Sequence, residues 1–180
     1  MKRRGALSGL ITPFGITQLV MLGIVCVALF LAYRPWQRGR VREAVHEQFP
    51  TIIGIDGAQL ARWMSAKDEQ PPTIFDVRTQ AEFDASHLPG ALHIAPSATP
   101  SSLGYENTPF VVYCTVGFDS ASYALGLMQR GYQRVQILDG GIYQWANEGR
   151  ALEGVLGSKE RVKNSSGPYS ALLDPAHRAP

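Results

Sequence analysis

The longest uninterrupted apolar stretch of the chain occupies residues 14–33 (FGITQLVMLGIVCVALFLAY) and contains no charged residue. A helix of about 20 apolar residues is long enough to cross the hydrocarbon core of a bilayer. Arginines lie on both sides of the stretch, and Tyr33 and Trp36 stand where amphipathic rings favour the membrane interface. The pattern predicts a single-pass transmembrane helix in the cell membrane, preceded by a basic tail at residues 1–13.

A cleaved signal peptide is the alternative interpretation, because the basic stretch MKRR comes before the apolar one. The apolar stretch is longer than the ~7–15 residues of a signal-peptide core, and no small-residue cleavage pattern follows it, so we favour the anchor. Lys and Arg occur on both sides of the stretch, so the positive-inside rule leaves its orientation open. Residues 34–50 are then expected to form a polar, helical or extended neck, and Cys26 is expected to be a small apolar filler within the span.

Beyond Pro50, short apolar runs alternate with segments of helical periodicity. Strands are predicted at residues 51–55, 73–75, 91–94, 110–113 and 135–138, and helices at 57–64, 79–85, 120–130 and 142–148. This alternation is typical of an α/β domain with a mostly parallel sheet flanked by helices, here expected over residues 51–153. Residues 154–180 are rich in Gly, Ser, Lys, Asn and Pro. They are predicted to form a flexible tail with weak contacts through Tyr169, Leu172 and Leu173.

Charge is segregated along the chain, so the net charge of +2 is a poor guide to its partners. Residues 1–42 hold seven basic and no acidic residues, whereas residues 44–153 hold six basic and twelve acidic ones. An acidic domain disfavours the binding of nucleic acid. The two cysteines lie far apart and the four histidines are scattered, so neither a disulfide framework nor a metal site is predicted. No cofactor is predicted either, and the histidines are expected to have structural or surface roles.

The stretch CTVGFDSA, residues 114–121, places a thiol at the end of the most apolar predicted strand. Loops beyond the carboxyl ends of parallel strands form the ligand crevice of such a sheet, so Cys114 is a candidate nucleophile. With a helix starting at Ser120, backbone N–H groups and the helix dipole can converge on the sulfur and stabilise a thiolate. Gly117 suits a loop that needs a positive φ angle, and the Ser120 hydroxyl can cap the helix and donate toward the sulfur. Taken alone, a cysteine that ends an apolar strand is more often part of the core.

Three blocks occur in an order and spacing that together are highly specific: FDVRTQAEFDASHLPGALHI (75–94), VVYCTVGFDSA (111–121) and GYQRVQILDGGIYQWANEGRAL (131–152). They strongly resemble the rhodanese (sulfurtransferase) domain. The resemblance implies a small α/β fold with a nucleophile at Cys114, which takes sulfur from a donor such as thiosulfate or a persulfide and becomes a persulfide itself. The sulfur then passes to another thiol, to cyanide or to a partner protein.

The resemblance also implies roles for the neighbouring residues. Backbone amides of the loop that follows the nucleophile hold the persulfide or the incoming anion, and the matching residues are Thr115, Val116, Gly117, Phe118, Asp119 and Ser120. Asp76 and Arg78 match an Asp-x-Arg motif that mainly supports the strand end. Arg78 can also form a local ion pair with Glu82, of little energetic weight.

The loop departs from its relatives in its charges. Phosphatases of this fold grip phosphate with an arginine, but residues 115–120 contain neither Arg nor Lys, which argues against phosphatase or arsenate-reductase chemistry. Many rhodanese-like relatives carry a cation at the place of Asp119, and a carboxylate there opposes a doubly charged donor such as thiosulfate. If Asp119 points to solvent or caps the helix, this effect is small, and a neutral or protein-bound persulfide is the alternative donor.

Two hypotheses for the function follow. The first is a membrane-anchored sulfurtransferase that uses Cys114. The second is a catalytically weak rhodanese-like module that binds a partner or senses redox state at the membrane. Cys114, Gly117 and Ser120 favour the first hypothesis, whereas Asp119 and the absence of a cation in the loop favour the second.

Overall fold

The computed structural model describes residues 13–95, 97–98, 108–154, 161–163 and 167–179. The chain divides into two compact units, Met1–Gln37 and Arg38–Pro180. Helix α1 (Pro13–Gln48) is continuous across this division. Its last eleven residues, 38–48, therefore belong to the second unit, and each unit is described by itself below.

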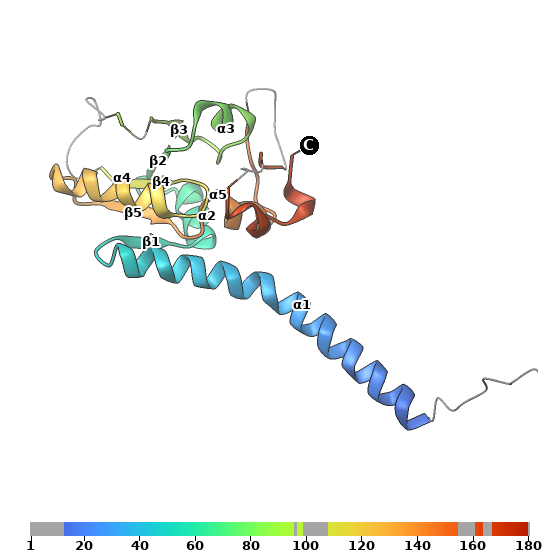
Figure 1. Cartoon of the computed structure of the whole chain (residues 1–180). Coiled ribbons are helices and arrows are strands. Elements are labelled where there is room, and N and C mark those ends of the chain that lie inside the picture. Colours follow the sequence, from blue (N-terminus) through green and yellow to red (C-terminus); the bar gives the residue numbers. More distant parts are fainter. Residues whose placement is uncertain (1–12, 96, 99–107, 155–160, 164–166, 180) are drawn as a thin grey trace, which may run out of the picture. The chain divides into compact units, whose positions relative to one another are not determined.

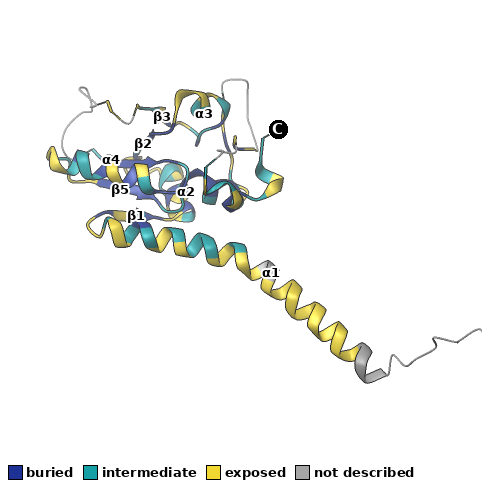
Figure 2. Ribbon diagram, viewed as in Figure 1, coloured by how far each residue is buried: buried dark blue, intermediate teal, exposed yellow. Residues whose placement is uncertain are grey.

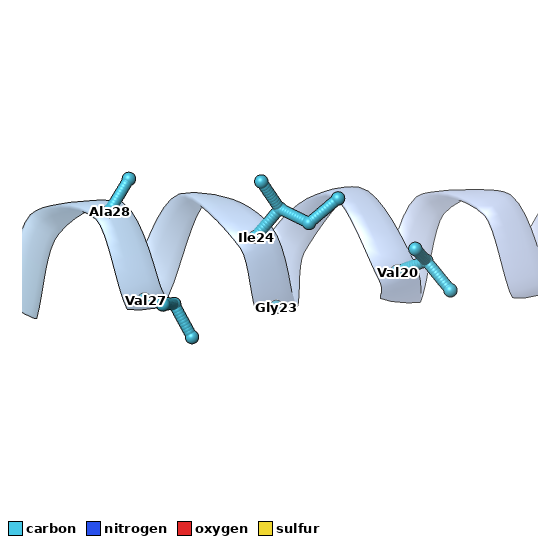
Figure 3. Close-up of a pocket in the computed structure, with 5 residues that line it drawn as sticks. All are labelled: Val20, Gly23, Ile24, Val27 and Ala28. Atoms are coloured by element: carbon cyan, nitrogen blue, oxygen red, sulfur yellow. The ribbon is translucent and has the colours of Figure 1, made fainter.

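In the first unit, helix α1 leaves its apolar side chains exposed (yellow in Figure 2); these are Leu19, Val20, Met21, Leu22, Ile24, Val25, Val27 and Leu29. Among the described residues this is the one helix that is long and apolar enough to cross a membrane. A signal sequence meets the same criteria. Figure 3 shows a shallow apolar pocket on this helix, lined by Val20, Gly23, Ile24, Val27 and Ala28. Because all five lining residues belong to a single helix, this pocket is not an enclosed binding site.

The second unit contains a sheet of five strands in the order β1-β5-β4-β2-β3 (Figure 1). The strands are β1 (Ile53–Ile55), β2 (Thr73–Asp76), β3 (Leu92–His93), β4 (Phe110–Tyr113) and β5 (Val135–Leu138), and all their pairings are parallel. The helices are α2 (Gly57–Ser65), α3 (Gln80–Ala85), α4 (Phe118–Gln129) and α5 (Gly141–Asn147). The predicted α/β fold with a parallel sheet flanked by helices is thus confirmed.

Alternate residues of the central strand β4 face opposite sides of the sheet, as the pleat of a strand requires. Val111 and Tyr113 belong to one hydrophobic cluster, and Phe110 and Val112 belong to the other. The first cluster is completed mainly by α2 and α5, and the second by α4 and the end of α1. Every residue of β4 is buried, which is typical of a strand covered on both faces (dark blue in Figure 2).

Side-chain caps explain where two of the helices begin. Asp56 accepts a hydrogen bond from the Gln59 N–H at 2.7 Å, and the Asp56 N–H donates back to Gln59, which forms a capping box before α2. Thr79 and Glu82 form the same motif before α3. The predicted start of α4 at Ser120 is wrong by two residues, because the helix begins at Phe118.

The neck and the predicted tail are more closely attached to the domain than the sequence indicates. Val45, in the neck, is only 2% exposed and belongs to the same cluster as Val112. The described part of residues 154–180 contains the 3-10 helices η1 (Ser170–Leu172) and η2 (Pro175–His177), and its buried side chains are Val162, Leu172 and Leu173. Arg38 of α1 pairs with Asp174 at 2.7 Å and donates to the Leu172 carbonyl at 3.0 Å.

Candidate active site

Cys114 follows directly on the last residue of β4. Because β2 and β5 pair with β4 on its two sides, this strand end lies in the middle of the sheet edge where ligand crevices form. The side chain of Cys114 is on the same face as Phe110 and Val112 and is only 1% exposed. The predicted nucleophile therefore has the expected position in the fold, beneath a cover of neighbouring residues.

The loop after Cys114 turns back over the sulfur. The N–H of Gly117 donates a hydrogen bond to Cys114 Sγ at 3.1 Å. Gly117 has a φ angle of 127°, a conformation that favours glycine, and it immediately precedes α4. The hydrogen bond thus comes from the amino end of a 12-residue helix, whose partial positive charge favours a thiolate or an anion at the sulfur.

Ser120 supports the loop in a different way from the one expected. Its hydroxyl donates to the Gly117 carbonyl at 2.8 Å, so it fixes the turn of the loop instead of capping the helix or donating to the sulfur. Gly117 occupies the cap position and makes no side-chain cap. Ser120 is fully buried, so losing this hydrogen bond would leave a polar group unpaired in the core.

The first turn of α5 also holds the loop after Cys114. The Ile142 N–H donates to the Cys114 carbonyl at 3.0 Å, and the Tyr143 N–H donates to the Thr115 carbonyl at 3.2 Å. Gly141 has a φ angle of 59°, and a Cβ atom on it would lie 2.6 Å from the Thr115 carbonyl oxygen. The sequence indicates a turn here, but not that Gly141 lets two backbone segments meet beside Cys114.

Asp76 and Arg78 form a buried ion pair at the end of β2. Arg78 Nη2 donates to Asp76 Oδ2 at 2.6 Å and to the Ser86 carbonyl at 2.6 Å, and Arg78 Nε donates to Asp76 Oδ1 at 3.0 Å. Burial opposes the charge of Arg78, but the hydrogen bond and the charge of Asp76 leave its pKa raised. The suggested Arg78–Glu82 ion pair is wrong, because the guanidinium turns to Asp76 and Glu82 completes the cap of α3.

Tyr113 links this ion pair to the next loop. The Arg78 guanidinium lies 5.8 Å from the centre of the Tyr113 ring, and the Tyr113 hydroxyl accepts a hydrogen bond from the Leu88 N–H at 3.1 Å. Burial raises the pKa of Tyr113 well above its usual range, and the charge of Asp76 raises it further. The phenol is therefore neutral at physiological pH. Such a network supports the strand ends on which the Cys114 loop stands.

A cleft of about 490 Å³ lies against the loop on its other side. One wall comes from the segment after β2 and includes Arg78 and Thr79, and the other comes from Thr115 and α4. Asp119 lines the cleft in the first turn of α4 and is exposed. The Asp119 side chain is thus exposed to solvent and also lines the cleft. Its carboxylate stabilises the helix as well, because it lies in the first turn.

Three contacts of the loop region come from residues that sequence reasoning missed or did not connect to the site. A Cβ atom on Gly117 would lie 3.2 Å from a methyl carbon of Val45. The rings of Phe118 and Tyr169 stack with their centres 5.9 Å apart. His46 Nε2 lies 2.8 Å from Asp139 Oδ1, at the turn before α5. These partners come from the neck and the tail, and local patterns carry no signal for such distant contacts.

The histidines near the site bind backbone groups. His87 Nδ1 lies 2.8 Å from the Phe83 carbonyl oxygen, and His93 Nε2 lies 2.8 Å from the Arg78 carbonyl oxygen. Within the described ranges, no group of three or more His, Cys, Asp or Glu side chains is arranged to hold a metal ion.

Known proteins that are similar to this chain share the domain that contains Cys114. A sulfurtransferase of Allochromatium vinosum is 33% identical over 97 residues, which cover 53% of this chain and 89% of the relative. The probable adenylyltransferase/sulfurtransferase MoeZ of Mycobacterium tuberculosis is 30% identical over 161 residues, and the match covers 77% of this chain but only 40% of MoeZ. Among solved structures, the BH2092 protein of Bacillus halodurans is 25% identical with a TM-score of 0.51, covering 62% of this chain and 84% of that one.

The family assignment rests on the domain that carries Cys114. The rhodanese-like domain matches residues 56–148, which is more than half of the chain and includes β2, β4, β5 and the loop after Cys114. The chain belongs to the rhodanese-like domain family.

Proposed function

We propose that this protein is a membrane-anchored sulfurtransferase that carries sulfane sulfur on Cys114 as a persulfide. The observation that carries the proposal is the hydrogen bond from the Gly117 N–H to Cys114 Sγ at the amino end of α4. The acceptor is a thiol, cyanide or a partner protein. Two of the relatives are named sulfurtransferases, which supports the same chemistry.

Each of the two steps of sulfur transfer uses a thiolate as the nucleophile. In the first step, the Cys114 thiolate attacks the outer sulfur of thiosulfate or of a small persulfide, the S–S bond of the donor breaks, and sulfite or a thiolate leaves with the electron pair. In the second step, an acceptor thiolate attacks the outer sulfur of the Cys114 persulfide, and Cys114 leaves as a thiolate. The helix end beside the sulfur stabilises the anion in both steps, and no external oxidant or reductant is consumed.

The chain offers a matched control for the nucleophile, because Cys26 and Cys114 are its two cysteines. Sulfur transfer from thiosulfate or a small persulfide to a thiol is measured with the full chain in detergent. Cys114→Ser is expected to lower the rate at least a hundredfold, since a hydroxyl is a far weaker nucleophile than a thiolate. Cys26→Ser is expected to stay within twofold of the unmodified chain. Activity that survives in Cys114→Ser would contradict the assignment.

The second candidate function is a catalytically weak module that binds a partner or senses redox state. Two observations favour it, namely the 1% exposure of Cys114 and the carboxylate of Asp119 at the cleft. Slow alkylation of Cys114, together with no sulfur uptake from any donor, is the result expected of such a module. Uptake of one sulfur on Cys114 would exclude it.

The membrane anchor at residues 14–33 is the other half of the proposal and rests on the exposed apolar side chains of α1. The full chain is expected to stay with the membrane fraction in high salt and at alkaline pH, and to be released by detergent. Release by high salt, or a mature chain that starts after this segment, would contradict the anchor. A reporter enzyme fused to the C-terminus would then show which side of the membrane the domain faces.

A further inference from the structure

The cleft beside Asp119 is much larger than the smallest sulfur acceptors and donors require. Its volume of about 490 Å³ is in the range of pockets that hold ligands of metabolite size. Thiosulfate and cyanide have only a few atoms each. Thr115 and Asp119, which line the cleft, belong to the loop that follows Cys114, so a ligand in the cleft contacts this loop.

Two opposite charges that line this cleft have no charged partner among the described residues. Among the described residues, Asp119 has no hydrogen bond or ion pair. Arg130 donates to the Gly126 carbonyl at 2.8 Å, and no acidic partner for it occurs in the described part of the chain. The other guanidinium in the lining, that of Arg78, is already paired with Asp76. Within the described lining of the cleft, Asp119 and Arg130 are therefore the charges that remain available to a ligand.

The two charges lie along one wall at a spacing that suits a small peptide. Arg130 reaches back over the turn at Gly126, which is seven residues beyond Asp119 in the same helix. Seven residues correspond to about 10 Å along a helix axis. Between the two charges the wall is polar and neutral, because Ser122 and Tyr123 line it; burial raises the pKa of the Tyr123 phenol to about 12. A glutamate on the opposite wall, Glu82, is engaged in the cap of α3.

We propose that this cleft selects the sulfur acceptor, and that it favours a thiol of dipeptide or tripeptide size with an ammonium group near the sulfur and a carboxylate at the far end. Asp119 binds the ammonium group, and Arg130 binds the carboxylate. The inference rests on the proposed function and specifies its substrate class. In this proposal the Asp119 carboxylate helps to bind the acceptor, whereas its charge alone suggests a loss of activity.

The charges act on the second half of the reaction. The acceptor thiolate attacks the outer sulfur of the Cys114 persulfide, the S–S bond breaks, and the product is the persulfide of the acceptor together with the Cys114 thiolate. Asp119 holds the ammonium group beside the loop, which brings the attached thiolate to the outer sulfur and raises its effective concentration there. An acceptor with a negative group close to its sulfur is repelled by the same carboxylate.

The test compares acceptors that differ in charge. The full chain in detergent is loaded with sulfur from a small persulfide, and transfer is timed with cysteamine, 2-mercaptoethanol, 3-mercaptopropionate and the dipeptide cysteinylglycine. Asp119→Asn is expected to slow transfer to cysteamine about fivefold to tenfold, to speed transfer to 3-mercaptopropionate, and to change 2-mercaptoethanol less than twofold. Arg130→Gln is expected to slow cysteinylglycine and to leave cysteamine unchanged. Asp84→Asn, on the exposed face of α3, is the control and should change none of these rates.

Each outcome of this test decides between explanations. Equal effects of Asp119→Asn on all four acceptors would overturn the inference while leaving the sulfurtransferase function intact. An effect of Arg130→Gln that is the same for cysteamine and cysteinylglycine would overturn the role of Arg130. If intact mass shows that Cys114 takes up no sulfur, the proposed function itself fails, and the inference fails with it.

Discussion

Among single residues, we propose that Asp119 governs which sulfur donors the site accepts. It lies five residues beyond Cys114, in the first turn of α4, and its carboxylate is exposed at the cleft beside the loop. Because the loop 115–120 has no Lys or Arg, this carboxylate is the charge nearest to an incoming anion on the loop itself. A dianion such as thiosulfate is therefore opposed by it, whereas a neutral persulfide is not.

Reversing this charge is expected to improve the use of thiosulfate. In Asp119→Arg, kcat/KM for thiosulfate should rise roughly tenfold to a hundredfold at low ionic strength, and the gain should shrink as salt screens the charge. The matched variant Asp84→Arg adds the same charge on α3, away from the cleft lining. An equal gain in both variants, or no gain in Asp119→Arg, would show that the loop charge does not govern access of the donor.

The elements around Cys114 are held by backbone contacts between two loops. The loop after β4 gives the Gly117 N–H to the sulfur, while the first turn of α5 gives two N–H groups to the carbonyls of Cys114 and Thr115. Gly141 has no side chain, so the two backbone segments can come this close. The position of the nucleophile thus depends on α5 as much as on α4.

Gly141→Ala is expected to destabilise the domain by more than the cost of a positive φ angle alone. Gly149→Ala is the control, because Gly149 has a φ angle of 69° and no atom within 4 Å of an added Cβ. It should cost about 1–2 kcal/mol of unfolding free energy. Gly141→Ala should cost roughly 1–3 kcal/mol more, because its Cβ meets the Thr115 carbonyl, and should also lower kcat/KM. Urea unfolding and sulfur-transfer rates measure both effects, and equal losses in the two variants would contradict the account.

Sequence patterns locate most of these elements because the patterns are local. β4 and β5 match their predicted bounds, and α2 begins at the predicted residue, Gly57. The start of α4 differs because Gly117, with its positive φ angle, occupies the cap position that the sequence suggests for Ser120. The partner of Arg78 differs because a helical spacing suggests Glu82, whereas the buried Asp76 two residues earlier satisfies more of its donors.

At the scale of the domain unit Arg38–Pro180, segments from both ends of the sequence pack around the Cys114 loop. Val45 of α1 lies against Gly117, and Tyr169 stacks on Phe118. The two segments are also joined to each other through the Arg38–Asp174 ion pair. No local pattern predicts these contacts, since each depends on residues more than 40 positions apart.

The C-terminal segment is expected to contribute to the stability of the domain. Leu173 is 0% exposed, so Leu173→Ala should lower the unfolding free energy by about 2–5 kcal/mol. The comparison variant Leu92→Ala removes the same side chain at a position that is 54% exposed and should cost about 0.5 kcal/mol or less. Urea unfolding followed by tryptophan fluorescence, to which the buried Trp145 contributes, reports both values. A loss in Leu173→Ala no larger than in Leu92→Ala would mean that residues 167–179 behave as a loose tail.

The most direct test of the central claim is the intact mass of the full chain after treatment with a small persulfide. One added sulfur atom is expected in the unmodified chain and in Cys26→Ser, removed by a reducing agent and passed on to a thiol acceptor. No added sulfur is expected in Cys114→Ser. A chain that takes up no sulfur from a persulfide or from thiosulfate, or that takes it up without Cys114, would contradict the account.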